Sequence, residues 1–188
     1  MKKYFVVTIL ALISGFSLLA QEIDIKDMRN HIWKETDSVV FEFSCLPTVK
    51  PGVIPQDDLY YYWYDGKAIH ETKGSYAGWL FDGYFKELNK SGRIIKQGCF
   101  RNGLKNGIWK EWWENGSLGS VYEWDNGIKE GELINYDSYG NILNAETYKN
   151  GQLNGPALYY QEDSLIIEKI YKKGALVREA IIHINEAD

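Results

Sequence analysis

Short apolar runs alternate with turn residues along the chain, and from residue 83 onward this pattern repeats every 24 residues. Each repeat holds two apolar or aromatic runs, and glycines bound each run. Two short strands separated by turn residues indicate one β-hairpin per repeat. The glycines that keep the step form three columns: Gly83, Gly107, Gly131 and Gly155; Gly92, Gly116 and Gly140; and Gly103, Gly127 and Gly151, with Gly174 one residue early.

Asn-Gly pairs indicate how these hairpins turn. Tight reversals need positive φ, which Gly adopts without strain and Asn tolerates. Helical repeats would need longer units that glycine does not interrupt. We therefore expect an all-β fold, an elongated single-layer antiparallel sheet of repeated β-hairpins. The six pairs are Asn102-Gly103, Asn106-Gly107, Asn115-Gly116, Asn126-Gly127, Asn150-Gly151 and Asn154-Gly155.

Two columns of the repeat are apolar in every unit. One holds Phe85, Trp109, Leu133 and Ala157, and the other holds Leu88, Trp112, Tyr136 and Tyr160. We expect the second column to be the continuous core row, because it is aromatic or aliphatic in every unit. Truncating Trp112 to alanine should then cost about 3–5 kcal/mol. Trp113 shares its column with polar residues and should face solvent, so its truncation should cost less than about 1.5 kcal/mol.

The repeats cover most of the chain. Residues 59–177 hold them, including a partial copy at residues 62–68 that mirrors residues 112–118. Residues 21–58 lack the pattern and are interpreted as a non-repeat N-terminal cap, which the end of a repeat array needs. Residues 178–188 are interpreted as a closing strand followed by a tail.

The first twenty residues have the layout of a cleavable signal peptide. Lys2 and Lys3 precede an apolar run, and Ala20 is a small residue at the expected cut. We expect an exported protein of the periplasm or cell envelope, or a secreted one, with no integral membrane span after cleavage. The formal net charge of −5 argues against a nucleic-acid partner.

The segment Gly107-Ile-Trp-Lys-Glu-Trp-Trp-Glu-Asn-Gly116, followed by Trp124-Asp-Asn-Gly127-Ile-Lys-Glu-Gly131, resembles the bacterial variant of the MORN repeat. Proteins of this kind are grouped as antitoxin-like repeat proteins of the YwqK type. The resemblance covers about residues 60–177. It implies a gently twisted antiparallel sheet of successive hairpins, and it points to an antitoxin-like or immunity-like role for an exported member.

Cys45 and Cys99 both lie in the part expected to be exported. An oxidising compartment permits a disulfide between them. Such a bridge would stabilise the fold by about 4 kcal/mol, because it would close a long loop. Two unpaired thiols are the alternative.

We expect neither a cofactor, nor a metal site, nor catalysis. The histidines His31, His70 and His183 have no partners at metal-ligand spacing, and no nucleotide-binding glycine motif or nucleophile elbow occurs. The alternative is a glycan hydrolase that uses Glu87 and Glu111. These share one column and should lie about 10 Å apart on one face.

Aromatic residues carry the functional expectation. The chain has 14 Tyr, 7 Phe and 7 Trp, and exposed aromatic patches mark binding sites. We expect a non-enzymatic binding module that presents an aromatic-rich sheet face to a protein partner. The alternatives are an envelope protein that binds or hydrolyses glycans and a purely structural envelope component. The candidate partner-binding residues are Trp63, Trp79, Trp109, Trp113 and Tyr159.

Overall fold

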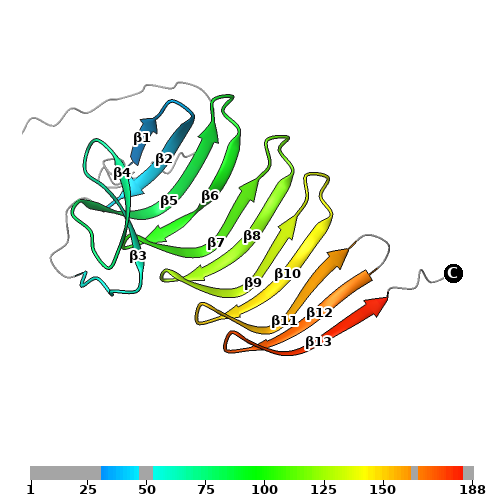
Figure 1. The fold of residues 1–188 in the computed structure, drawn as a ribbon. Coiled ribbons are helices and arrows are strands. Elements are labelled where there is room, and N and C mark those ends of the chain that lie inside the picture. Colours follow the sequence, from blue (N-terminus) through cyan, green and yellow to red (C-terminus); the bar gives the residue numbers. More distant parts are fainter. Residues whose placement is uncertain (1–30, 47–52, 162–164, 184–188) are drawn as a thin grey trace, which may run out of the picture.

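The computed structural model describes residues 31–46, 53–161 and 165–183, and within these segments the chain is entirely β. Thirteen strands form one open antiparallel sheet without a helix in the described segments, which confirms the expected fold class. Successive hairpins lie side by side from one end of the molecule to the other (Figure 1). The strands are β1 (His31–Glu35), β2 (Val39–Cys45), β3 (Tyr60–Tyr64), β4 (Ile69–Lys73), β5 (Trp79–Asn89), β6 (Ile94–Arg101), β7 (Leu104–Trp112), β8 (Leu118–Asp125), β9 (Ile128–Tyr136), β10 (Ile142–Lys149), β11 (Gln152–Gln161), β12 (Leu165–Lys172) and β13 (Ala175–His183).

The turns between repeats adopt the geometry expected of Asn-Gly pairs. In the turn between β6 and β7, Asn102 has a φ of 51° and Gly103 has a φ of 81°. Two successive left-handed residues match the twist of the flanking strands. Asn126-Gly127 and Asn150-Gly151 repeat this geometry, and Lys173-Gly174 adopts it without an asparagine.

Two of the six Asn-Gly pairs do not form tight reversals. Gly107 and Gly155 lie inside β7 and β11, with φ values of 72° and 121°. Each sits beside a register shift, where an extra residue in one strand bends that strand. The expectation that all six pairs mark hairpin turns is therefore wrong, because positive φ serves a β-bulge as well as a reversal.

Hydrogen bonds tie each turn to the preceding hairpin. The N–H of Gly127 donates to the carbonyl of Lys105 at 2.8 Å, and the N–H of Asn126 donates to the Asn106 side chain at 3.3 Å. The backbone bond recurs from Gly103 to Phe81, from Gly151 to Lys129 and from Gly174 to Leu153. The side-chain bond recurs from Asn102 to Asp82, from Asn150 to Glu130 and from Lys173 to Asn154. These bonds hold each turn against the preceding hairpin, and they persist at Gly174 although the last step is one residue shorter.

The partial repeat does not extend the sheet. Strand β2 pairs with β5 from Phe81 to Asn89, so it occupies the place beside β5 that a preceding repeat would take. Strand β3 pairs with β5 only through Trp63 and Tyr64. The β3–β4 hairpin therefore branches off and packs on the sheet, where the Tyr62 and Phe100 rings lie 4.8 Å apart between centroids.

The larger of two buried clusters lies on one face of the sheet, which we call the packed face, and a smaller cluster of Leu46, Leu59, Tyr61, Leu80 and Leu104 lies at the N-terminal end. The packed face bears the buried side chains of Phe85, Trp109, Leu133 and Ala157, which line up across the strands with Phe43 and Tyr122. The opposite side is called the outer face. Tyr62, Tyr64 and Ile69 of the β3–β4 hairpin pack against the core at its N-terminal end.

The expected core row is wrong. Trp112 and its column are only half-buried, whereas Trp109 is 1% exposed. The two columns lie three positions apart, and strand geometry sends them to opposite faces. The β3–β4 hairpin packs on one of these faces, and that contact decides which column becomes the core.

Of the two alternatives for Cys45 and Cys99, the structure has the unpaired thiols, and both cysteines are free. Cys45 is buried in the core of the packed face. Cys99 pairs across the strands with Tyr84, which is 75% exposed on the outer face. The sheet itself separates the two sulfur atoms, so they cannot reach bonding distance without rearrangement of the backbone.

Several expectations fall outside the described residues. These are the signal peptide at residues 1–20, residues 21–30 and 47–52 of the cap, and the tail from residue 184. The described part of the cap comprises residues 31–46, whose β1–β2 hairpin continues the sheet at the edge of β5, and residues 53–58. A search of the described segments for a helix with the length and apolar character of a membrane span finds none.

Candidate functional site

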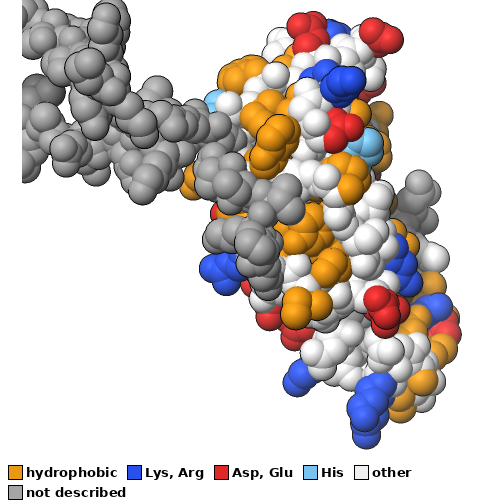
Figure 2. Space-filling model, turned by 90° about the vertical axis from the view of Figure 1, so that its left-hand side faces the viewer, with side chains coloured by type: hydrophobic (Ala, Val, Ile, Leu, Met, Phe, Trp, Pro, Cys, Tyr) orange, Lys and Arg blue, Asp and Glu red, His pale blue; other side chains and the backbone are white. Residues whose placement is uncertain are grey.

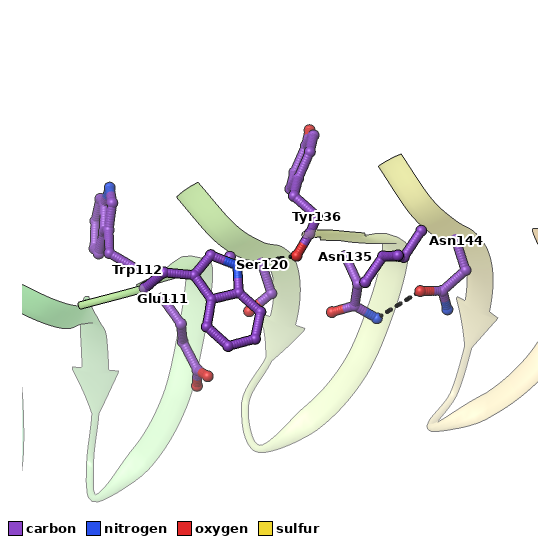
Figure 3. A pocket seen from close by; sticks show the side chains of 9 residues that line it. Glu111, Trp112, Ser120, Asn135, Tyr136 and Asn144 are labelled. Atoms are coloured by element: carbon purple, nitrogen blue, oxygen red, sulfur yellow. Dashed lines mark hydrogen bonds between the residues drawn. The ribbon is translucent and has the colours of Figure 1, made fainter. Parts of the chain in front are cut away.

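A cavity of about 420 Å³ opens on the packed face where β7, β8, β9 and β10 lie side by side. This volume is within the range of small-ligand pockets. Figure 3 shows Glu111, Ser120, Asn135 and Asn144 along the cavity, while the rings of Trp112 and Tyr136 point away from it. The lining residues are Glu111, Trp112, Trp113, Gly119, Ser120, Asn135, Tyr136, Leu143 and Asn144.

Trp113 forms the aromatic wall of the cavity. It follows Trp109 and Glu111 at a spacing of two residues, so it shares the packed face with them. Its indole N–H donates to the carbonyl of Tyr136 at 3.0 Å, which fixes the ring across two strands. The ring lies over Gly119, where an added Cβ would come within 3.3 Å of the indole nitrogen. Trp113 is 45% exposed, as expected from its polar column.

Bulges shape this part of the sheet. Glu111 pairs with Ser120 but Trp112 pairs with Leu118, which leaves Gly119 as an extra residue in β8. Strand β10 has the same irregularity, with Leu143 as its extra residue. Both extra residues line the cavity. Bulges re-aim neighbouring side chains, and here they open the space between strand ends.

Neutral polar side chains form the floor of the cavity. Ser120 is only 9% exposed and lines the cavity. Asn135 donates to Asn144 at 3.0 Å, and Asn144 donates to Glu146 at 3.2 Å. An amide has two N–H donors and two acceptor sites, so both asparagines keep further bonding capacity.

Glu111 is the acidic residue of the cavity wall, and its charge is balanced. The Tyr122 hydroxyl donates to its Oε1 at 2.5 Å, and Lys96 Nζ lies 3.1 Å from the same oxygen. Burial alone would raise the pKa of Glu111, but the Tyr122 hydrogen bond and the Lys96 charge outweigh burial and lower this pKa. Glu111 is therefore ionised at neutral pH, with Oε2 left as an acceptor.

Glu87 lies in the same row but outside the cavity. In register, Glu87 faces Lys96 and Lys96 faces Glu111, so the lysine stands between the two carboxylates. Burial raises the pKa of Glu87; Lys96 opposes this and Glu111 adds to it. Glu87 is not among the lining residues. Glu87 and Glu111 thus differ in the direction of their pKa shifts, and only Glu111 lines the cavity.

The five aromatic residues expected to bind a partner do not form one surface. Trp113 and Tyr159 share the packed face, and Tyr159 pairs across the strands with Asn144 at the next strand beyond the cavity. Its hydroxyl donates to Glu146 at 2.9 Å. The expected partner-binding role of Trp109 is wrong, because Trp109 is the largest fully buried side chain and cannot contact a partner.

Trp63 and Trp79 lie at the N-terminal end instead. Trp63 stacks on His70 with ring centroids 4.2 Å apart and donates to Thr72 at 2.9 Å. Trp79 is 39% exposed at the start of β5. Figure 2 looks onto this end of the molecule and shows hydrophobic side chains interrupted by charged ones. Trp33 in β1 and Tyr60 in β3 are two further exposed hydrophobic residues.

Metal-binding groups do not gather in the described segments, where no cluster of three or more His, Cys, Asp or Glu side chains occurs. His31 pairs with Glu42 at 3.2 Å and His70 with Asp65 at 3.0 Å. Asp65 also accepts the backbone N–H groups of Lys67 and Ala68. This carboxylate therefore orders the β3–β4 turn.

Sequence reasoning missed the polar residues of the cavity. Ser120, Asn135 and Asn144 are not among the candidate binding residues that the sequence suggests. A usable signal exists, because Glu111 and Asn135 each follow a core residue by two positions and so share its face. Comparison with protein-family models and with curated proteins finds no match to this chain.

Proposed function

We propose that this protein is a non-catalytic binding module that holds its ligand in the cavity beside Trp113. The observation that carries the proposal is the combination of a fixed aromatic wall with polar groups that keep free bonding capacity. Ligand sites are typically recesses with apolar walls and a few convergent polar groups. The rest of the packed face provides a rigid support for them.

Binding is better supported than glycan hydrolysis. A glycosidase places two carboxylates on either side of the bond that is cleaved. Here Glu111 lines the cavity, Glu87 does not, and Lys96 lies between them in register. Glu111 is also bonded to Tyr122 and Lys96, which favours a constant charge over proton transfer.

Export to the periplasm or cell envelope, which the sequence predicts, is part of the same proposal. An exported, MORN-like scaffold of the periplasm or cell envelope would present the cavity to an envelope component. An immunity-type role would use the same surface against a toxin.

The test is affinity capture from an envelope extract of the source cell by the immobilised full chain. Wild type should retain one component saturably, and the double variant Trp113→Ala with Asn144→Ala should lose it. Tyr84→Ser is the matched control, because Tyr84 is exposed on the outer face of the same sheet. Equal capture by the double variant would contradict the site. Chemical conversion of the captured component, seen by mass spectrometry, would contradict the absence of catalysis.

A further inference from the structure

The aromatic wall of the cavity offers its ring face to a ligand. The indole N–H of Trp113 is already bonded to the Tyr136 carbonyl. The ring is half-exposed and rests on Gly119, so one side lies against the sheet while the other remains open. A ring face attracts the C–H groups of a flat, partly apolar ring. It offers no donor of its own.

The polar groups of the cavity suit hydroxyls. A hydroxyl both donates and accepts, and a serine hydroxyl or an asparagine amide can match both roles. Ser120, Asn135 and Asn144 supply three such groups on adjacent strands. Ser120 lines the cavity, and its hydroxyl is not among the buried polar atoms left unpaired in the described residues, so it is open to a partner from the cavity. A ligand hydroxyl would be such a partner.

The charge of the cavity favours a neutral ligand. Glu111 is the one carboxylate among the lining residues, and the pair with Lys96 leaves its Oε2 as an acceptor. An acidic ligand would meet this carboxylate at close range. A neutral hydroxyl would donate to it.

An extended peptide has no free backbone to pair with here. Strands β7, β8, β9 and β10 are each bonded to a neighbour on both sides. Addition of a strand needs an open sheet edge. Recognition in the cavity must therefore use side chains, which suits a compact ligand.

We propose that the cavity binds a neutral saccharide, with one pyranose ring stacked on Trp113 and its hydroxyls bonded to Ser120, Asn135 and Asn144. This inference rests on the proposed binding function and names its ligand class. A pyranose ring joins an apolar C–H face to a rim of hydroxyls, and the cavity has the matching wall and floor.

The experiment titrates the ¹⁵N-labelled full chain with cellotriose, chitotriose, maltotriose and trigalacturonic acid while the indole N–H signals are followed. The Trp113 signal is assigned by its loss in Trp113→Phe. At least one neutral trisaccharide should shift this signal saturably, and trigalacturonic acid should bind about tenfold more weakly or not at all. Ser120→Ala should weaken binding about threefold to tenfold by removing one hydrogen bond.

Two further variants separate recognition from folding. Gly119→Ala removes no polar group but displaces the Trp113 ring, so it should weaken binding while the urea midpoint stays close to wild type. Tyr84→Ser should leave affinity within about twofold, because it lies on the other face.

If no neutral trisaccharide shifts the Trp113 signal while capture of the envelope component still depends on the cavity, the ligand is not a saccharide and the binding function stands. A protein component would be the outcome in that case. Shifts confined to other indoles would overturn the assignment of the site.

Discussion

Trp109 and Trp112 lie three positions apart in one strand, and they contribute differently to the free energy of unfolding. Trp109 is buried among Phe85, Phe100 and Tyr122, and its removal would leave a large cavity. We expect Trp109→Ala to cost about 3–5 kcal/mol and Trp112→Ala about 1–2 kcal/mol, since its side chain is only half-buried. Urea midpoints of both variants measure this. An equal or larger loss for Trp112→Ala would mean that the faces are assigned the wrong way round.

Glu87 and Glu111 should respond to pH in opposite directions. The pKa of Glu111 is lowered in the folded state, so its contribution to stability is present above the unfolded pKa of about 4.3 and is lost as pH falls through the folded value. The pKa of Glu87 is raised, chiefly by burial, so its ionised form weakens the fold once pH exceeds that pKa.

Glutamine substitutions at the two positions test this difference by urea unfolding at pH 7 and at pH 4. Glu111→Gln should destabilise at pH 7, and its deficit should shrink as the pH falls. Glu87→Gln should be at least as stable as wild type at pH 7. The same sign of change for both variants at pH 7 would contradict the assigned environments.

At the scale of single elements, the turn between β12 and β13 differs in sequence from the equivalent turns between the preceding repeats. Lys173 has a φ of 51°, the left-handed position that Asn fills in the three preceding turns. Asn tolerates this conformation better than a long side chain does. Lys173→Asn should therefore stabilise the protein by about 0.5 kcal/mol. Lys172→Asn is the control: it lies in β12, where Asn is a poor strand residue, and should give no gain.

For the whole molecule, stability should fall toward the C-terminus. Each hairpin contacts its neighbours in line, and the buried hydrophobic residues of the described segments end at Ala157. Repeat arrays with such local contacts unfold from their weak end. We expect amide hydrogen exchange to be slowest in β5–β8 and fastest in β12–β13. Uniform protection across all strands would show that the sheet unfolds as one unit.

Local sequence patterns are enough to predict the architecture and much of its turn chemistry. Glycine columns at a constant step predict consecutive hairpins, because only local backbone conformation is needed to form each turn. Asn102, Asn126 and Asn150 therefore have the positive φ that their Asn-Gly pairs predict. The exposure of Trp113 also follows from a local pattern, the polar residues in its column.

Contacts between residues that are distant along the chain decide which face becomes the core and where the cavity opens. Both columns, that of Trp109 and that of Trp112, are apolar, and the choice depends on the β3–β4 hairpin leaving the sheet to pack on one face. The tertiary fold also decides that Cys45 and Cys99 lie on opposite sides of the sheet. Ser120, Asn135 and Asn144 meet because three strands align in register with bulges between them. Register and layer contacts join residues that are distant along the chain, and no local pattern of side chains specifies them.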